Sequence, residues 1–364
     1  MSGKRAFIGG LATATPAFRI GQKGAEEFLK EHYSHALSEK SLSVMDKIFS
    51  HPSIERRSFS FESPSVLLKE DADARIERFT DSAIELSITA IKGALEKGGL
   101  DAKDISALVV NTCTGYLCPG LSTYLIEELP LRRDIRAFDL VGGGCGGAIP
   151  NLELAAGLVK EEGGAVLSVS VEICSATFQM EDDLSLIVSN ALFGDGAAAA
   201  VVREERQVRE KGQGRKEEEE GLEILYSASR YAPEYREAIR YVYKKGELHN
   251  RLSVALPRLI REEAGRLVQD ILRKSSFKRE DIKHCAIHPG GEKIIDAVKD
   301  ELGLKEDDVS PARKVLKEYG NMSSPTVLFV LEEVLKKGME KGDLCLMLSF
   351  GAGLSTHGML MRRG

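Results

Sequence analysis

The 364-residue sequence has no run of apolar residues close to the ~18 that a membrane-spanning helix needs, so we predict no membrane span. It has no excess of positive charge either: the formal net charge is −6 at pH 7, and no basic stripe follows any predicted element. This balance argues against nucleic-acid binding. It is still compatible with a local basic patch at the entrance of a binding site for a phosphorylated ligand. Tryptophan is absent, whereas the 43% of hydrophobic and 29% of charged residues are typical of a globular protein.

Patterns that would indicate metal binding or disulfides are missing as well. No CxxC pair and no Cys/His cluster at zinc spacing occurs among the six cysteines, which are Cys113, Cys118, Cys145, Cys174, Cys285 and Cys345. We therefore expect no metal site and free thiols in a reducing compartment, which favours a cytoplasmic protein. The N-terminal stretch has two basic residues before a small-residue run, but Gly9 and Gly10 interrupt it, so a first β-strand is a better interpretation than a signal peptide.

Strand-like and helix-like segments alternate along the chain. Apolar residues recur at helical spacing over Asp73–Lys97, and two later segments with proline in the first turn, Pro257–Leu272 and Pro325–Leu335, are also predicted helices. Buried strands are predicted at Ile105–Thr112, Gly164–Ile173, Lys283–His288 and Asp343–Phe350. Because tight hairpin signals are missing between these strands, the pattern predicts an α/β protein with mostly parallel pairing.

An internal repeat is visible in the same order in both parts of the chain. The segment Leu100–Asn111 matches Phe277–His288, and Phe193–Ala199 resembles Phe350–Thr356. These matches predict two similar halves, at residues 1–205 and 222–364. The segment between them, residues 206–221, is rich in charged residues and is expected to form an exposed excursion.

Cys145 lies in the middle of the glycine run GGGCGG, just before a helix predicted from about Ala148. Three interpretations compete, because Gly142, Gly144 and Gly147 also match the GxGxxG spacing of a dinucleotide-binding turn, and a small buried residue could simply pack the turn. At a helix start, unpaired N–H groups and the positive end of the dipole favour a thiolate and can bind an oxyanion. A dinucleotide site gains nothing from a cysteine there, so a nucleophile is the favoured hypothesis.

His288 and Asn321 supply two further groups at the ends of predicted elements. His288 ends a strand and precedes Pro-Gly-Gly, at the kind of strand end where α/β folds bind ligands. Asn321 lies in the loop before the helix that begins near Pro325. Each could be structural, the histidine in the core and the asparagine in a turn. Together with Cys145 they offer a nucleophile, a proton-handling group and an amide donor, the set that a decarboxylative carbon–carbon condensation needs.

Motifs around these three residues resemble the type III polyketide synthases, the chalcone synthase-like enzymes of the thiolase superfamily. They are GCGGA around Cys145, IHPGG around His288 and YGNMSSPTVLFVL around Asn321, followed in order by matches in ALFGDGAAA and FGAGLS. The resemblance implies an α/β thiolase fold, in which two similar βαβαβαββ-type halves form a layered αβαβα core. It also implies a homodimer.

The activity implied by this resemblance is that of an acyltransferase. An acyl-CoA starter would be extended with malonyl-CoA, without a metal or an organic redox cofactor, and the chain would cyclise to a pyrone, a resorcinol or a related polyketide. Cys145 would carry the growing chain. His288 and Asn321 would promote malonyl decarboxylation and stabilise the enolate, and His288 would also pair as an imidazolium with the Cys145 thiolate.

The resemblance also assigns substrate-binding residues. Phe193 would be the aromatic gatekeeper between the CoA tunnel and the cavity, Cys118 would reach into the partner's cavity, and the other cavity residues would be Cys113, Cys174, Thr177, Gly351 and Gly353. Basic contacts to CoA are expected from Lys47, Arg56, Arg57 and Lys293. The family's GFGPG loop is SFGAG here, and a second gatekeeper aligns near His249 or Asn250, changes that favour a bacterial-type enzyme over a plant-type one.

Three alternatives remain open at the level of sequence. The first is a condensing enzyme of the ketoacyl-ACP synthase III type, which would use an acyl carrier protein instead of CoA. The second is a binding or scaffold protein that retains the fold without turnover, although nothing would then require all three of Cys145, His288 and Asn321. The third is the dinucleotide-binding turn.

Overall fold

The computed structural model describes residues 4–205 and 221–364, so the predicted charged excursion at 206–221 lies outside the described residues except for Gly221. The strands of the core form one nine-stranded sheet in the order β11-β12-β13-β8-β1-β7-β6-β4-β5. The N-terminal half contributes β1 (Ala6–Ala14), β4 (Ile105–Thr112), β5 (Arg136–Val141), β6 (Ala165–Glu172) and β7 (Gly196–Glu204). The C-terminal half contributes β8 (Leu222–Tyr231), β11 (Ile282–Ile287), β12 (Leu344–Gly351) and β13 (Ser355–Arg363).

The two halves repeat one pairing scheme. In the N-terminal half β1 runs antiparallel to β7, β7 antiparallel to β6, and β6 parallel to β4. In the C-terminal half β8, β13, β12 and β11 pair in the same sequence of directions. A short antiparallel contact, Phe7 opposite Glu223 and Ile8 opposite Leu222, joins the halves. The predicted repeat is therefore confirmed at the level of topology.

The prediction of mostly parallel pairing is wrong. Only β4–β5, β4–β6 and β11–β12 are parallel, and the remaining neighbours in the large sheet are antiparallel. The reason lies in the connections: β12 returns directly into β13 through the turn after Gly351, which brings the second strand back alongside the first.

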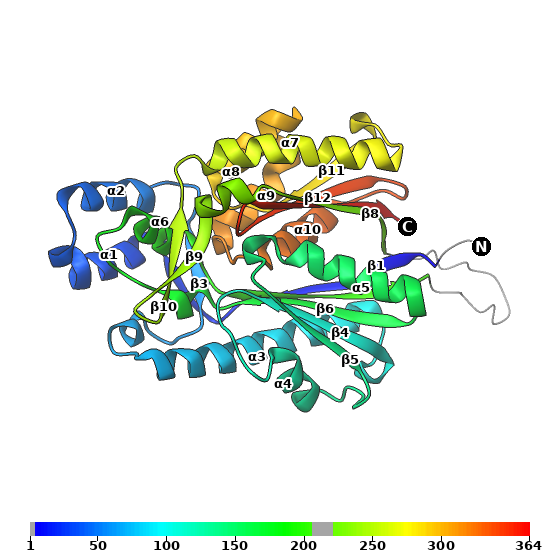
Figure 1. Cartoon of the computed structure of the whole chain (residues 1–364), viewed down its shortest axis with the longest axis horizontal. Helices are drawn as coiled ribbons and strands as arrows, with labels where there is room; N and C mark the ends of the chain where they lie inside the picture. The colour runs from blue at the N-terminus through cyan, green and yellow to red at the C-terminus, as the bar shows by residue number, and fades with distance from the viewer. Residues whose placement is uncertain (1–3, 206–220) are drawn as a thin grey trace.

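Helices cover both faces of each half and produce the layered αβαβα core that was predicted (Figure 1). The outer layers contain α3 (Ala72–Gly98), with α4 (Leu121–Glu128), on the N-terminal half and α7 (Leu256–Ser275), with α8 (Glu292–Leu302), on the C-terminal half. The central layer contains α5 (Ala148–Glu162) and α10 (Thr326–Lys337), which contact strands of both halves, while α9 (Glu306–Tyr319) packs on α10. Residues 326–331 of α10 are all buried, as expected for a helix that is apolar around its whole circumference.

A smaller cluster of elements extends from one end of the core, at the left of Figure 1. It has its own apolar core and consists of α1 (Gln22–Tyr33), α2 (Glu39–Phe49), α6 (Leu184–Leu192) and the two-stranded sheet of β2 (Phe18–Gly21) and β3 (Arg56–Phe59). The hairpin of β9 (Ile239–Lys244) and β10 (Glu247–Leu252) lies beside it. Among the described residues, no helix is both long and apolar enough to span a bilayer.

Candidate active site

Cys145 lies in a single 3₁₀ turn, Gly144–Gly146, that leads into the first residue of α5, Ala148. The turn is packed against the loop between β12 and β13, which belongs to the other half of the molecule. The backbone N–H of Ala352 donates to the carbonyl of Gly143 at 3.3 Å, and the Ser349 hydroxyl donates to the carbonyl of Gly146 at 3.1 Å.

The glycines of the run make this close approach between the halves feasible. A Cβ on Gly144 would lie 2.9 Å from the backbone nitrogen of Ala352, and a Cβ on Gly146 would lie 3.0 Å from the Cα of Gly351. Gly144 also has a φ of +56°, a conformation that a glycine adopts without strain. The run is thus explained by packing between the two halves.

This packing corrects the assignment of Gly351 to the cavity wall. Gly351 is fully buried at the end of β12, and a side chain there would collide with the carbonyl of Gly143 and with the Ser355 hydroxyl. Because Gly351 has no side chain, the turn that contains Cys145 can pack directly against the end of β12. Gly353, two residues later, does line a cavity, the one that also contains Cys113.

His288 directly follows β11, and Asn321 precedes α10. The backbone N–H of His288 donates to the Leu348 carbonyl at 2.8 Å, which continues the pairing of β11 with β12. Asn321 is held against the end of α6, because its N–H donates to Leu192 at 2.9 Å and its carbonyl accepts from Gly194 at 3.0 Å. These bonds fix Asn321 beside Phe193, the predicted gatekeeper.

The carboxamide of Asn321 has one orientation. Its Oδ1 accepts a hydrogen bond from the backbone N–H of Ser323 at 2.8 Å, and an N–H can only donate, so this atom must be the carbonyl oxygen. The amide nitrogen is therefore left as the free donor. Burial raises the pKa of the Cys145 thiol, and the side chains of Ser323 and Asn321 oppose this shift as hydrogen-bond donors.

The structure brings Cys145, His288 and Asn321 together on one cavity. The cavity is also lined by Phe193 and by two of the predicted CoA contacts, Lys47 and Lys293. Both ring nitrogens of His288 are buried without a hydrogen-bond partner, so the imidazole is available for proton transfer.

Burial shifts the pKa values of both Cys145 and His288. It raises the pKa of the Cys145 thiol to about 11 and lowers the pKa of His288 to about 3, because neither ion would be solvated. Burial therefore opposes the thiolate that the helix start is expected to favour. Moving the proton from Cys145 to His288 creates both charges at once, and opposite charges in a water-poor cavity stabilise each other. We therefore expect formation of the thiolate to depend on His288.

Arg57 and Arg56 differ from the prediction of CoA contacts. Arg57 is 1% exposed, and its guanidinium donates to the carbonyls of Asn190 (2.6 Å) and Phe193 (2.7 Å), so its assignment to CoA binding is wrong. It caps the end of α6, together with Gln22, and supports the backbone of Phe193. Arg56 is partly exposed, is paired with Glu318, and does not line the cavity of Cys145.

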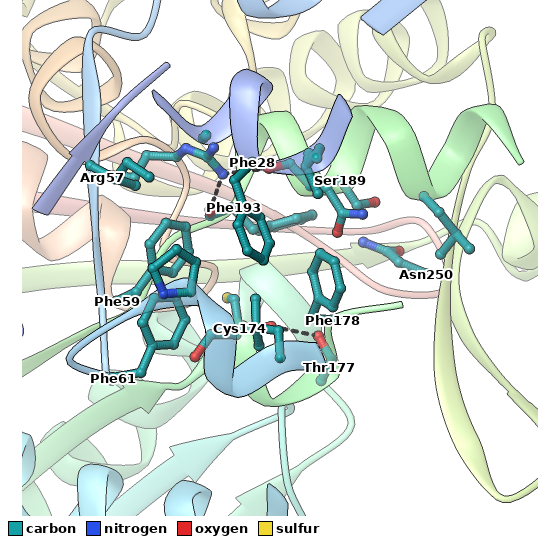
Figure 2. Close-up of a pocket in the computed structure, with 18 of the residues that line it drawn as sticks. Phe28, Arg57, Phe59, Phe61, Cys174, Thr177, Phe178, Ser189, Phe193 and Asn250 are labelled. Atoms are coloured by element: carbon teal, nitrogen blue, oxygen red, sulfur yellow. Dashed lines mark hydrogen bonds between the residues drawn. The ribbon is translucent and has the colours of Figure 1, made fainter. Parts of the chain in front are cut away.

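The other predicted substrate-binding residues lie outside the cavity of Cys145. Cys174 and Thr177 lie in a 3₁₀ turn, η5 (Cys174–Thr177), and line a separate apolar pocket together with Phe193 (Figure 2). Cys113 lines the cavity of Gly353, and its sulfur is 3.4 Å from the Ser323 hydroxyl. Cys118 is exposed. In the described part of the chain, no cluster of histidine, cysteine and acidic side chains could hold a metal ion.

Glu172 was missed by the sequence analysis. It is the last residue of β6 and is completely buried, and its carboxylate accepts from the N–H groups of Cys113 (2.9 Å) and Thr114 (3.1 Å) and from the Ser324 hydroxyl (2.7 Å). Burial raises its pKa. A signal was available, since a charged residue at the end of a completely buried strand requires several donors.

Comparisons with known proteins agree on one family. Residues 18–220 match the model described as FAE1/type III polyketide synthase-like protein, and residues 223–363 match that of the C-terminal domain of chalcone and stilbene synthases. A 3,5-dihydroxyphenylacetyl-CoA synthase of Streptomyces toyocaensis is 33% identical over 86% of this chain and 81% of its own. The alpha-pyrone synthesis polyketide synthase-like Pks18 of Mycobacterium tuberculosis is 28% identical over 98% of this chain and 90% of its own.

Solved structures extend the comparison to the fold. PKS-I from the brown alga Ectocarpus siliculosus superposes with a TM-score of 0.89 at 28% identity, and all of both chains is covered. The 1,3,6,8-tetrahydroxynaphthalene synthase of Streptomyces coelicolor A3(2) gives 0.85 at 23% identity over 97% of this chain and 98% of that chain. The predicted thiolase fold is confirmed.

Replacing Gly146 with alanine should destabilise the protein. The new Cβ would lie 2.8 Å from the Cδ2 of His357, and we expect a loss of about 1–3 kcal/mol in the free energy of unfolding, measured in urea. Gly157→Ala is the matched control, because a Cβ added to this exposed glycine of α5 would have no atom within 4 Å; it should gain about 0.5–1 kcal/mol. Equal losses in both variants would refute the packing explanation.

Alkylation of Cys145 should depend on His288. In His288→Gln the thiol loses its proton acceptor, so the rate with iodoacetamide at pH 7.5 should fall at least ~10-fold, and the pH profile should move up toward the pKa of about 11 that burial imposes. Peptide mass spectrometry would follow Cys145, with the exposed Cys118 as the internal reference. Unchanged Cys145 kinetics in the variant would rule out the coupled ionisation.

Proposed function

The chain belongs to the type III polyketide synthase family, the chalcone synthase-like enzymes, and we propose that it loads an acyl group from coenzyme A onto Cys145 and extends it with malonyl-CoA. The family makes it an acyltransferase-type enzyme. The observation that carries the specific proposal is the Asn321 carboxamide, whose oxygen is occupied by the Ser323 N–H and whose NH₂ faces the cavity of Cys145 and His288.

In the loading step, His288 accepts the proton of Cys145, and the thiolate attacks the thioester carbonyl of the acyl-CoA. The C–S bond to CoA breaks, and the CoA thiolate takes the proton back from the imidazolium. The products are an acyl-Cys145 thioester, free CoA thiol and a neutral His288. A neutral imidazole again has one N–H to donate, which prepares it for the second step.

In the extension step, malonyl-CoA loses carbon dioxide, and the bonding electrons pass into the thioester as an enolate. The developing negative charge lies on the thioester oxygen, where the Asn321 NH₂ and the His288 N–H stabilise it as preorganised donors. The enolate carbon then attacks the acyl-Cys145 carbonyl. This forms the new carbon–carbon bond, releases the Cys145 sulfur and leaves a β-ketoacyl-CoA that is two carbons longer. No metal or organic redox cofactor is required, because decarboxylation supplies the carbanion.

Coenzyme A is proposed to enter along the cavity wall formed by Lys47 and Lys293. Both line the same cavity as the three catalytic candidates, and ammonium groups there would pair with the CoA phosphates.

We also propose that the enzyme is a cytoplasmic homodimer in which a second copy closes the cavity of Cys113 and Gly353. Support comes from Tyr116 and Tyr243, which line that cavity although they are 69% and 74% exposed in the single chain.

An enzyme that requires an acyl carrier protein is not favoured, since the matching family models cover both halves of the chain and describe chalcone and stilbene synthases and type III polyketide synthase-like proteins. A chain extension followed by cyclisation to a pyrone or resorcinol is the proposed outcome.

The test combines purified enzyme, malonyl-CoA and a panel of short, aromatic and long-chain acyl-CoA starters. Mass spectrometry should detect acyl adducts on Cys145 and cyclised polyketides, and Cys145→Ala should abolish both. The reason is that the thioester to Cys145 is an obligatory intermediate of the proposed reaction. Adducts without extension would indicate dependence on a carrier protein, and products formed by Cys145→Ala would refute the proposal.

A further inference from the structure

The cavity of Cys145 opens to solvent between two segments that are far apart in the sequence. Cys145, His288 and Asn321 are buried, whereas three other lining residues, Lys47, His51 and Lys293, are exposed and mark the mouth of the cavity. Lys47 and His51 come from α2 and the loop after it, and Lys293 comes from the start of α8. The mouth therefore has one wall in the small cluster of elements and one wall in the C-terminal half.

His51 and Glu292 meet across this mouth, and we call them the mouth pair. Glu292 is the first residue of α8 and also lines the cavity. One of its carboxylate oxygens, Oε2, lies 3.2 Å from Nδ1 of His51. The mechanism described above uses neither side chain.

The Nδ1 atom of His51 has two neighbours that make opposite demands on it. The backbone N–H of Ser53 donates to Nδ1 at 3.3 Å, which requires an unprotonated nitrogen. The carboxylate of Glu292 can only accept, so its contact with Nδ1 is favourable when this nitrogen carries a proton. The Ser53 hydroxyl, 3.0 Å from Nδ1, donates or accepts and suits both states. The mouth pair thus has two states that differ by one proton.

Charged groups from three helices influence this balance. Glu292 on α8 favours the protonated ring, while Lys47 on α2 and Lys293 on α8 line the same cavity and oppose it. Arg313 on α9 lies 3.7 Å from the other oxygen of Glu292 and competes with His51 for that carboxylate. Histidine is the side chain whose charge ordinarily changes between about pH 5 and 8. The charge at the mouth can therefore change near neutral pH.

A phosphate group resembles the Glu292 carboxylate in what it offers to His51. Both are anions whose oxygens only accept hydrogen bonds, so a phosphate that enters between Lys47 and Lys293 can replace Glu292 beside a protonated His51. A neutral ring leaves the Glu292 charge uncompensated by His51, and this charge repels an incoming anion.

From this geometry we propose that the mouth pair is a proton-linked autoinhibitory contact, in which Glu292 occupies His51 until a phosphate of coenzyme A takes its place. The proposal rests on the proposed function, because it concerns how CoA thioesters enter the cavity. The bound phosphate favours the protonated ring more than Glu292 alone does. Binding of CoA therefore takes up protons and becomes tighter as the pH falls from 8.0 to 6.5.

Calorimetry with CoA itself tests this without turnover. The ratio of the dissociation constants at pH 8.0 and pH 6.5 should be at least ~3-fold larger for the parent enzyme than for His51→Gln, because only the parent can add a charged donor for the phosphate. The comparison also removes the titration of the CoA phosphate, which is the same for both proteins. Proton uptake, measured in buffers of different ionisation enthalpy, should be larger for the parent.

Glu292→Gln tests the autoinhibitory part. Removal of the competing carboxylate should tighten CoA binding at least ~3-fold at both pH values. The matched control is His35→Gln, which replaces an exposed histidine of the 3₁₀ turn η1 (Ser34–Ala36) outside the cavity and should keep the ratio of the parent. The side chains of His51 and Glu292 are 49% and 36% exposed, so neither replacement removes core packing.

Two results would overturn the proposal. One is a pH ratio and a proton uptake that His51→Gln leaves unchanged, and the other is a Glu292→Gln enzyme that binds CoA no more tightly than the parent. An enzyme that binds CoA with the predicted pH dependence but never acylates Cys145 would refute the proposed function alone. An enzyme that does not bind CoA at either pH would refute both.

Discussion

The close approach of the Cys145 turn to the loop between β12 and β13 is the constraint on which the rest of the site depends. It joins two segments, one from each half, that lie about two hundred residues apart in the sequence. Glycines in both segments allow the close contact. Because the two halves repeat one topology, α5 and α10 are equivalent central helices. Cys145 lies just before the first and Asn321 just before the second, so each half delivers one functional group at a helix start.

A buried polar network holds these two helix starts in register. Asn151 on α5 donates to Asn111 on β4 at 2.8 Å, Asn111 donates to Ser324 at 2.8 Å, and Ser324 donates to Glu172 on β6 at 2.7 Å. Ser323, the neighbour of Ser324, in turn orients the Asn321 carboxamide. Buried polar groups are costly unless each finds a partner, and a fully satisfied network of this kind fixes one arrangement of the core. The direction of the Asn321 amide is therefore a property of the fold.

Much of this could be predicted from the sequence, because the informative residues carry local signals. Cys145, His288 and Asn321 each lie in a distinctive turn beside an element end, and the repeat gave the two halves. Arg57 could not be separated from Arg56, because neighbouring residues of a strand face opposite sides and the sequence does not say which side is covered. The role of Gly351 depends on a contact with the other half, and strand direction in β13 depends on the path of its connection. Such features are set by tertiary packing and leave no local pattern.

The central claim is that Asn321 acts as a hydrogen-bond donor to the enolate of the extender unit. Asn321→Asp tests it most directly, because aspartate retains an oxygen for the Ser323 N–H and removes the donor. The measurement is the release of carbon dioxide from malonyl-CoA, with acylation of Cys145 followed in parallel. The account predicts that decarboxylation falls on the order of 100-fold or more while the acyl-Cys145 adduct still forms. Decarboxylation at the rate of the parent enzyme would contradict it.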